Sequence, residues 1–328
     1  MKLHHDKALF AEIISRASEH PVNGGLGIKP QFLEKDYWIT NALSHLSKSP
    51  YKETGIFKGG TSLAKANAIG YRFSEDIDVA VIKNEDWSDS KLKETIRGIE
   101  KVMATDMTPI EHPDASKGSR YRKTYHSYPL LSGGSADISV IPGQILLEIN
   151  SFANPFPYQL KTIKSFIYDF LTAYSHRDII QEYELEPFDV NVLDKRTTMT
   201  EKIVSLVRFS LAENPIPQLE AKIRHFYDLH YLFEDEECKE YLNGNTFKEN
   251  FISLYNHDRE LFDEPNGWNV RDIKESPLIY NLHGLWEQLE KRYYKELPPL
   301  AYSISVPLPD KIISGLKEIL HHIEYLTL

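Results

Sequence analysis

The sequence has little cysteine, no long apolar run and no excess of positive charge. Its single cysteine, Cys238, excludes an intramolecular disulfide and is typical of a protein in a reducing compartment. No stretch of about 18 apolar residues is present, and the first residues form an amphipathic pattern without a signal-like apolar segment. We therefore expect neither export nor a membrane span, and we predict a cytoplasmic protein.

The net charge of −10 at pH 7 argues against a surface that is basic all over, as general DNA-coating proteins have. One local basic stretch is interleaved with aromatic residues: Lys117, Arg120, Tyr121, Arg122, Lys123 and Tyr125. Such a stretch suits a nucleic-acid backbone with bases stacked on rings. A solvated strand with alternating polar residues explains it equally simply, and we favour that interpretation.

The composition is that of a globular protein. With 328 residues, 41% hydrophobic and 12% aromatic, the chain is long enough for one large core or for two domains that share a cleft. Internal repeats and low-complexity segments are absent from the sequence. The function must therefore be sought in local motifs.

The most informative stretch is residues 57–82, which is typical of a strand, a glycine turn, a helix and an acidic strand. Gly59 and Gly60 precede the expected helix, and Thr61 or Ser62 can cap it. Backbone without Cβ atoms at a helix N-terminus lets amide groups bind a phosphate, which the helix dipole also favours. A plain turn is the alternative for a glycine pair considered alone.

Two aspartates follow on the acidic strand. Because side chains alternate along a strand, Asp76 and Asp78 leave one face while Ile77 and Val79 leave the other. Paired carboxylates repel each other unless a cation lies between them, and a hard divalent cation suits oxygen ligands. A solvated strand face is the alternative, but the glycine turn and the aspartates together favour phosphoryl or nucleotidyl transfer. Arg72 either binds a phosphate or neutralises Asp76.

A third carboxylate occurs in an apolar strand predicted at 144–151. Glu148 must reach solvent, a cation or a metal, because an unpaired buried carboxylate is costly. It is a candidate third metal ligand, and an edge glutamate that points to water is an equally good interpretation. Asp137, on a strand predicted at 136–141, is a weaker candidate.

The pattern of the remaining segments predicts helices at 6–19, 30–47, 88–104, 236–255, 276–296 and 309–326, and further strands at 120–131 and 187–193. Lys35 and Asp36 in the second helix are either close to the site or exposed. We expect an α/β domain at 1–195 and a helical domain at 196–328 that completes the active-site cleft.

The helical half has two segments of interest. Thr200 is expected to cap a helix on which Lys202 lies at the edge of the apolar stripe, where it either reaches a neighbouring groove or extends along the surface. Arg224 and Asp228 are four residues apart on another helix, where an exposed ion pair is the simple interpretation. The histidine pairs His4/His5 and His321/His322 lack the i,i+4 spacing of a helical metal site, so we predict no zinc site.

Taken together, several motifs resemble the AbiEii/AbiGii family of nucleotidyltransferase toxins, which are relatives of the DNA polymerase β superfamily. These motifs are GGTSL, RFSEDIDV, the isolated strand glutamate, TEKI and RHFYDLHYL, and the likeness covers roughly residues 30–235. The resemblance implies an α+β fold. Its nucleotidyltransferase core is a small mixed sheet with flanking helices, and a helical C-terminal domain follows.

The resemblance also implies roles for individual residues. Gly60 with Thr61 or Ser62 matches the motif that holds the triphosphate, and Asp76 and Asp78 match the metal-binding acids. Lys202 matches a lysine that contacts nucleotide phosphates, and Asp228 matches a late aspartate needed for activity, with Arg224 beside it. Glu148 is a looser match to the third carboxylate. Two departures are the long spacing between the glycine and aspartate motifs and the GGT in place of the commoner GS.

The implied activity is Mg²⁺-dependent or Mn²⁺-dependent transfer of a nucleotide from an NTP to an acceptor such as the 3′ end of tRNA or another RNA. The implied setting is a toxin counteracted by a partner antitoxin. One alternative is a metal-independent ribonuclease, because Arg224 and His230 resemble the arginine and histidine motif of HEPN ribonucleases. A catalytically silent nucleotide-binding module is another.

Overall fold

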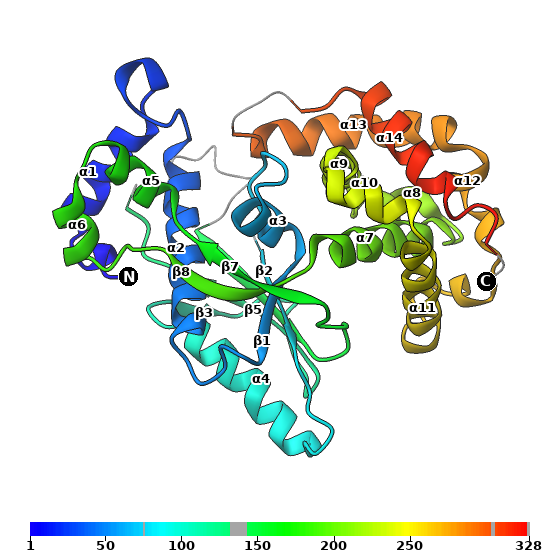
Figure 1. Cartoon of the computed structure of the whole chain (residues 1–328), viewed down its shortest axis with the longest axis horizontal. Coiled ribbons are helices and arrows are strands. Elements are labelled where there is room, and N and C mark those ends of the chain that lie inside the picture. Colours follow the sequence, from blue (N-terminus) through cyan, green and yellow to red (C-terminus); the bar gives the residue numbers. More distant parts are fainter. Residues whose placement is uncertain (75, 132–142, 303–305, 327–328) are drawn as a thin grey trace. The chain divides into compact units, whose positions relative to one another are not determined.

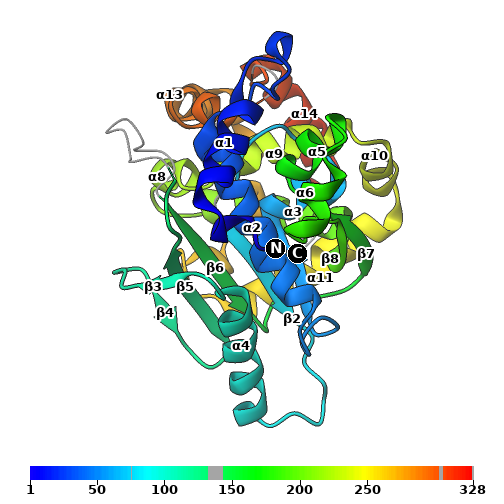
Figure 2. The same cartoon turned by 90° about the vertical axis from the view of Figure 1, so that its left-hand side faces the viewer.

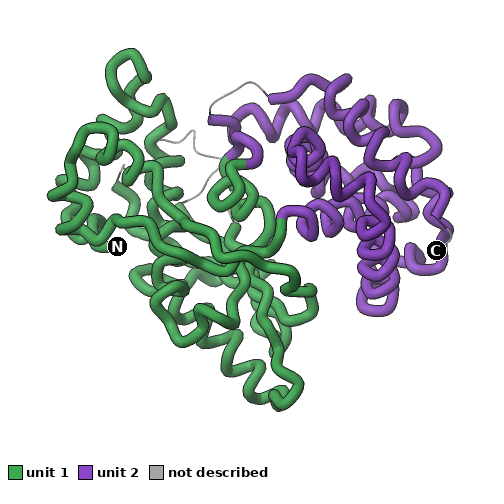
Figure 3. Tube along the Cα trace, viewed as in Figure 1, with its two compact units in different colours: residues 1–68, 73–194 green, residues 69–72, 195–328 purple. Residues whose placement is uncertain are grey.

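The computed structural model describes residues 1–74, 76–131, 143–302 and 306–326. The chain divides into two compact units, shown in two colours in Figure 3. Unit 1 contains Met1–Ala68 and Phe73–Asp194, and unit 2 contains Ile69–Arg72 and Lys195–Leu328. The short segment Ile69–Arg72 therefore belongs with the C-terminal helices although its sequence neighbours belong to unit 1.

The described part of unit 1 is built on one mixed sheet of eight strands (Figure 1). The strand order is β3-β5-β6-β2-β1-β8-β7, with β4 paired to β5. The strands are β1 Gly55–Lys58, β2 Asp76–Val81, β3 Thr108–Ile110, β4 Ser116–Lys117, β5 Tyr121–Ser127, β6 Gln144–Asn150, β7 Tyr158–Ile163 and β8 Phe188–Leu193. Strand β2 runs antiparallel to β1 and parallel to β6. The acidic strand is thus central, which explains why its apolar side chains are fully buried.

Six α-helices surround this sheet in the described residues of unit 1: α1 Lys7–Ser18, α2 Pro30–Ser47, α3 Gly59–Asn67, α4 Asp89–Met103, α5 Phe166–Ala173 and α6 Arg177–Glu182. Helices α2 and α4 pack on the same face of the sheet (Figure 2). Short 3₁₀ turns occur at Leu3–His5 and Pro21–Asn23.

Helix α2 is buried on nearly all sides, including its charged residues. Lys35 is 1% exposed and Asp36 is 4% exposed, so the suggestion that these two are exposed is wrong. The Asp36 carboxylate accepts a bond from Lys65 Nζ of α3 at 2.5 Å and another from the Phe166 backbone N–H of α5 at 2.9 Å. A buried carboxylate with two such donors is satisfied, and it links α2 to α3 and α5.

Unit 2 is helical in its described residues. Its helices are α7 Lys195–Ser210, α8 Pro215–Glu220, α9 Ile223–Glu234, α10 Glu236–Asn243, α11 Asn245–Leu261, α12 Pro277–Tyr280, α13 Leu282–Leu300 and α14 Pro309–His321, with 3₁₀ turns at Trp268–Val270 and Ile273–Glu275. Helix α7 begins five residues before Thr200, whose hydroxyl donates to the Arg196 carbonyl at 3.0 Å. The predicted Thr200 cap is therefore wrong, because the side chain bonds back inside the helix.

The α+β fold class is confirmed, and most predicted elements are present. The segments predicted as single helices at 236–255 and 276–296 are each divided in two, and β7 was not predicted. The predicted strand 136–141 and Asp137 lie outside the described residues. Within the described ranges, no helix combines the length and the apolar character needed to cross a membrane.

Candidate active site

Three carboxylates lie on one face of the sheet in unit 1. Ile77 and Val79 of β2 are fully buried on the opposite face, while Asp76 and Asp78 are half-buried. Glu148 of β6 is directly beside Asp78 in the parallel register. Residues in register on neighbouring strands share a face, with their Cβ atoms about 5 Å apart. The predicted alternation is thus observed, and Glu148 lies next to Asp78 on the face from which the two aspartates project.

A lysine and a tyrosine from the next strand adjoin this group. Lys123 pairs in register with Glu148, and its Nζ is 3.4 Å from Glu148 Oε1. Burial and the carboxylates of Glu148 and Asp78 raise the pKa of the Tyr121 hydroxyl above its usual range. The phenol therefore stays protonated at neutral pH and can donate a hydrogen bond next to the carboxylates.

Helix α3 begins at the same place, because Lys58 of β1 is in register with Asp78. Gly59 has φ of +77°, and a Cβ atom added to it would overlap the Asp78 carboxylate. Only glycine tolerates both the left-handed backbone and this close approach. Lys58, at the N-cap position, makes no capping side-chain bond. The first amide groups of α3 thus lie beside a carboxylate cluster, a combination that suits a phosphate bound together with a cation.

The hydroxyls after the glycines do not cap helix α3. Thr61 Oγ1 donates to the backbone carbonyl of Asp76, and Ser62 Oγ donates to the Gly59 carbonyl at 2.9 Å. Both side chains are buried. The predicted cap by Thr61 or Ser62 is wrong, because α3 starts at Gly59 and both hydroxyls bond to main-chain carbonyls. The Thr61 bond holds α3 against the start of β2.

The residues of interest in unit 2 form a separate buried cluster. Arg72 makes a bidentate pair with Asp228, with Nε–Oδ1 at 2.8 Å and Nη2–Oδ2 at 2.7 Å. Lys202 Nζ is 2.8 Å from the same Oδ2. Burial alone would raise the pKa of Asp228, but the two cations outweigh it and lower that pKa well below the usual range. Lys202 is only 6% exposed, so it is not a surface lysine.

Arg224 has a different partner. Its Nε is 2.7 Å from Glu296 Oε1 of α13, and Arg292 contacts the other oxygen of the same carboxylate at 2.7 Å. His230, the second residue of the ribonuclease-like pair, is half-buried, and burial lowers its pKa. Arg224 and Asp228 thus lie on one helix, as their spacing indicates, but they do not form the simple ion pair with each other. Arg224 pairs with Glu296, and Asp228 pairs with Arg72 and Lys202.

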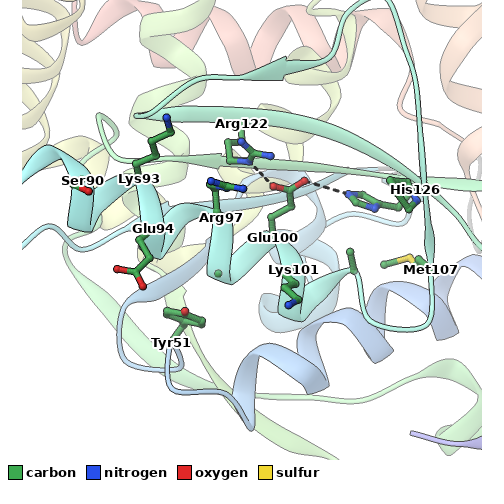
Figure 4. A pocket seen from close by; sticks show the side chains of 13 residues that line it. Tyr51, Ser90, Lys93, Glu94, Arg97, Glu100, Lys101, Met107, Arg122 and His126 are labelled. Carbon is green, nitrogen blue, oxygen red and sulfur yellow. Dashed lines mark hydrogen bonds and ion pairs between the residues drawn. The ribbon is translucent and has the colours of Figure 1, made fainter.

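The basic stretch around β5 is divided between the two faces of the sheet. Lys123 contacts Glu148, whereas Arg122 pairs with Glu100 of α4. His126 Nε2 is 3.9 Å from Glu100 Oε1, and these side chains border a pocket of about 810 Å³ beside α4 (Figure 4). The stretch is therefore not one continuous basic patch, in agreement with the interpretation as an alternating strand.

Two site residues were not assigned from the sequence. Lys123 and Tyr121 were noted only as part of the basic stretch, because the strand register that places them beside Glu148 is not local information. The one-residue spacing of Tyr121 and Lys123 along a predicted strand is the local signal that could have indicated a shared face. The sequence did not distinguish Gly59 from Gly60. In the structure, a Cβ atom added to Gly59 would overlap the Asp78 carboxylate.

Comparison with known proteins identifies one family. The family model described as the nucleotidyl transferase AbiEii toxin of a type IV toxin–antitoxin system matches residues 41–311. Among solved structures, the MenT4 nucleotidyltransferase toxin of Mycobacterium tuberculosis has a TM-score of 0.57 at 15% identity, covering 98% of this chain and 90% of that one. JHP933 from Helicobacter pylori, at 15% identity, covers 82% of this chain and 97% of its own, with a TM-score of 0.36. A comparison with curated proteins finds no match.

Proposed function

The chain belongs to the AbiEii family of nucleotidyltransferase toxins of type IV toxin–antitoxin systems, and from this premise we propose that it transfers a nucleotide from an NTP to an RNA acceptor. The proposal rests on the position of Gly59, where an added Cβ atom would overlap the Asp78 carboxylate, because this places a helix N-terminus beside the carboxylate cluster. Because the family consists of nucleotidyltransferases, the ribonuclease and the silent binding module are set aside.

The donor set fits a hard divalent cation. Asp76, Asp78 and Glu148 offer carboxylate oxygens from neighbouring strand positions, and Gly59 leaves the space that a Cβ atom would fill. Mg²⁺ and Mn²⁺ prefer such ligands and retain positions for phosphate oxygens and water. When bound, the cation would neutralise phosphate charge and activate the attacking hydroxyl group.

The protein's own groups supply binding and orientation. The amide groups at the start of α3 bind the phosphates of the NTP, and Thr61 fixes that helix end against β2. The Tyr121 hydroxyl, kept protonated, donates a hydrogen bond beside Glu148. Most of the rate enhancement would come from positioning and electrostatic stabilisation, as is general for phosphoryl transfer.

The second unit contributes a cationic cluster to the same reaction in this proposal. Lys202 contacts nucleotide phosphates, Asp228 orients Lys202 and Arg72, and Arg224 assists in nucleotide binding. The family resemblance supports these roles, and the distance of 2.8 Å between Lys202 Nζ and Asp228 Oδ2 supports the orientation of Lys202 by Asp228. Lys202→Met should then raise the KM for the NTP more than it lowers kcat, because it removes a phosphate contact. An unchanged KM for the NTP would remove Lys202 from the proposal.

The setting follows from the family. We propose that the protein acts in the cytoplasm, where it slows growth by modifying RNA and is counteracted by a partner antitoxin. The 3′ end of tRNA is the first acceptor to test. The acceptor is tested by incubating the purified chain with each α-labelled NTP, Mg²⁺ and total cellular RNA. Label in a tRNA band supports the proposal, and label confined to protein would overturn the RNA acceptor.

The catalytic assignment is tested with two isosteric variants. Asp76→Asn and Asp78→Asn should each abolish nucleotide incorporation while the far-UV and near-UV circular dichroism stay unchanged. Asp86→Asn is the matched control, because Asp86 is an exposed aspartate that follows β2 in the same unit. Incorporation that survives in both site variants at the level of the control would refute the assignment.

A further inference from the structure

The structure brings together a second group of potential metal ligands in unit 1. His4 and His5 lie in the first 3₁₀ turn, His45 lies in the last turn of α2, and Asp106 lies between α4 and β3. One ligand atom from each of His4, His5 and Asp106 lies within 4.8 Å of the others. His45 Nε2 is 3.1 Å from Asp106 Oδ2, so His45 extends the group.

One atom of this group has no hydrogen-bond partner. The His4 side chain is 9% exposed, and its Nε2 is buried without a hydrogen bond, 3.6 Å from Asp106 Oδ2. A buried polar atom without a partner is costly, and the large majority of such atoms in proteins are satisfied. A cation between His4 and Asp106 would give this nitrogen a partner.

The other nitrogen of His4 is already held. Its Nδ1 is 2.7 Å from the hydroxyl of Tyr37, which is fully buried in α2. Histidines that bind metals through one ring nitrogen usually make a hydrogen bond with the other, which fixes the ring and the tautomer. With Nδ1–H donating to Tyr37, the lone pair of Nε2 would point toward Asp106.

The spacing of His4 and Asp106 is close to that of a tetrahedral site. Zinc binds histidine nitrogen at about 2.0–2.1 Å, so neighbouring ligand atoms in a tetrahedron are about 3.3 Å apart. His4 Nε2 lies 3.6 Å from Asp106 Oδ2, within a few tenths of that value. The His5 ring is exposed and packs edge-on against His4, with centroids 4.3 Å apart, and its ligand atom lies within 4.8 Å of those of His4 and Asp106. His45 Nε2, 3.1 Å from Asp106 Oδ2, is at hydrogen-bond distance from the carboxylate.

We propose that unit 1 binds one Zn²⁺ through three side chains, His4, His5 and Asp106, and that His45 holds the Asp106 carboxylate in place by a hydrogen bond. Imidazole nitrogen with a single carboxylate suits Zn²⁺ better than Mg²⁺, which prefers oxygen ligands. The three ligands join the N-terminal turn to the turn after α4, and the hydrogen bond from His45 connects this group to the end of α2. This site is separate from the carboxylate group of β2 and β6, and it reverses the expectation from sequence that the adjacent histidines bind no zinc.

The test is a zinc titration of the untagged, full-length chain after removal of metals with a chelator. Equilibrium dialysis with elemental analysis should find one tightly bound Zn²⁺ per chain, and Co²⁺ should give the visible bands of a tetrahedral complex. Asp106→Asn and His5→Ala should each weaken Zn²⁺ binding about tenfold or more. Both changes leave the buried His4 in place, and His5 is exposed, so the fold is expected to persist and is checked by circular dichroism.

Two controls separate this site from other sources of binding. His321→Ala alters the other adjacent histidine pair, and Asp78→Asn alters the carboxylate group of β2; both should keep the full zinc stoichiometry. Zinc uptake that is equal in the wild type and in Asp106→Asn would overturn the proposal. Uptake that is lost in Asp78→Asn but kept in Asp106→Asn would also overturn it, because the metal would then lie at the carboxylates.

Discussion

Replacement of Gly59 by alanine tests the geometry of the candidate active site. The backbone φ of +77° costs a non-glycine residue about 1–2 kcal/mol, and the new Cβ atom would overlap the Asp78 carboxylate. To relieve the overlap, the carboxylate must move by about 1 Å. A displacement of that size at a catalytic group can reduce the rate about 100-fold. We therefore expect a modest loss of stability and a large loss of nucleotide incorporation.

The chain provides a matched control for this substitution. Gly267 in unit 2 has φ of +76°, and nothing lies within 4 Å of a Cβ atom added there. Gly267→Ala thus carries the same backbone cost without displacing a neighbour. Thermal denaturation should show at least as much destabilisation for Gly59→Ala as for Gly267→Ala, whereas incorporation of α-labelled nucleotide should fall only in Gly59→Ala. Equal activity of the two variants would show that the position of Asp78 next to Gly59 is not important for the reaction.

Three further predictions concern charged groups. Asp228→Asn should destabilise the protein by about 3–5 kcal/mol in chemical denaturation, because Arg72 and Lys202 would keep buried charges without their shared carboxylate. The pKa of Asp228 is lowered in the folded state, so its contribution should be complete above the unfolded pKa of about 3.9 and be lost as the pH falls below it. The difference in unfolding free energy between the wild type and Asp228→Asn should therefore be constant from about pH 5 to 8 and shrink in more acidic solution; a difference that grows on acidification would contradict the lowered pKa. Lys123→Met should lower the Mg²⁺ concentration for half-maximal activity by up to about fivefold, because it removes a cation that competes for the partly exposed Glu148. An increase in that concentration would instead indicate that Lys123 assists binding.

The local part of the site could be predicted from the sequence. The alternation of Asp76 and Asp78 against Ile77 and Val79 depends only on the period of a strand, and the structure has this alternation. The glycine turn before a helix is also a local signal. The isolated Glu148 could be flagged because a lone carboxylate in an apolar strand is costly to bury.

The non-local part could not be predicted in this way. Asp78 and Glu148 are neighbours only because β2 and β6 pair in parallel with one particular register. Arg72 is close in sequence to Asp76, yet its bidentate partner is Asp228, 156 positions away. Such pairings depend on how the elements pack, which leaves no periodic pattern in the sequence.

Two local signals gave wrong predictions for a physical reason. Thr61 and Thr200 were expected to cap helices, but each hydroxyl donates to a backbone carbonyl, and each lies within its helix. A threonine hydroxyl can form its hydrogen bond either as a helix cap or with a main-chain carbonyl. A threonine near the start of a helix therefore does not determine which residue begins the helix. Gly59 and Gly60, which were expected to precede the helix, are instead its first two residues, and Gly59 has a positive φ.

The most direct test of the account is a crystal structure of the protein with Mn²⁺ and a non-hydrolysable NTP, because Mn²⁺ is located by its anomalous scattering. We expect an anomalous peak in contact with the Asp76 and Asp78 carboxylates, with the nucleotide phosphates at the N-terminus of α3. A nucleotide bound elsewhere in unit 1, or a peak with no contact to either aspartate, would contradict it.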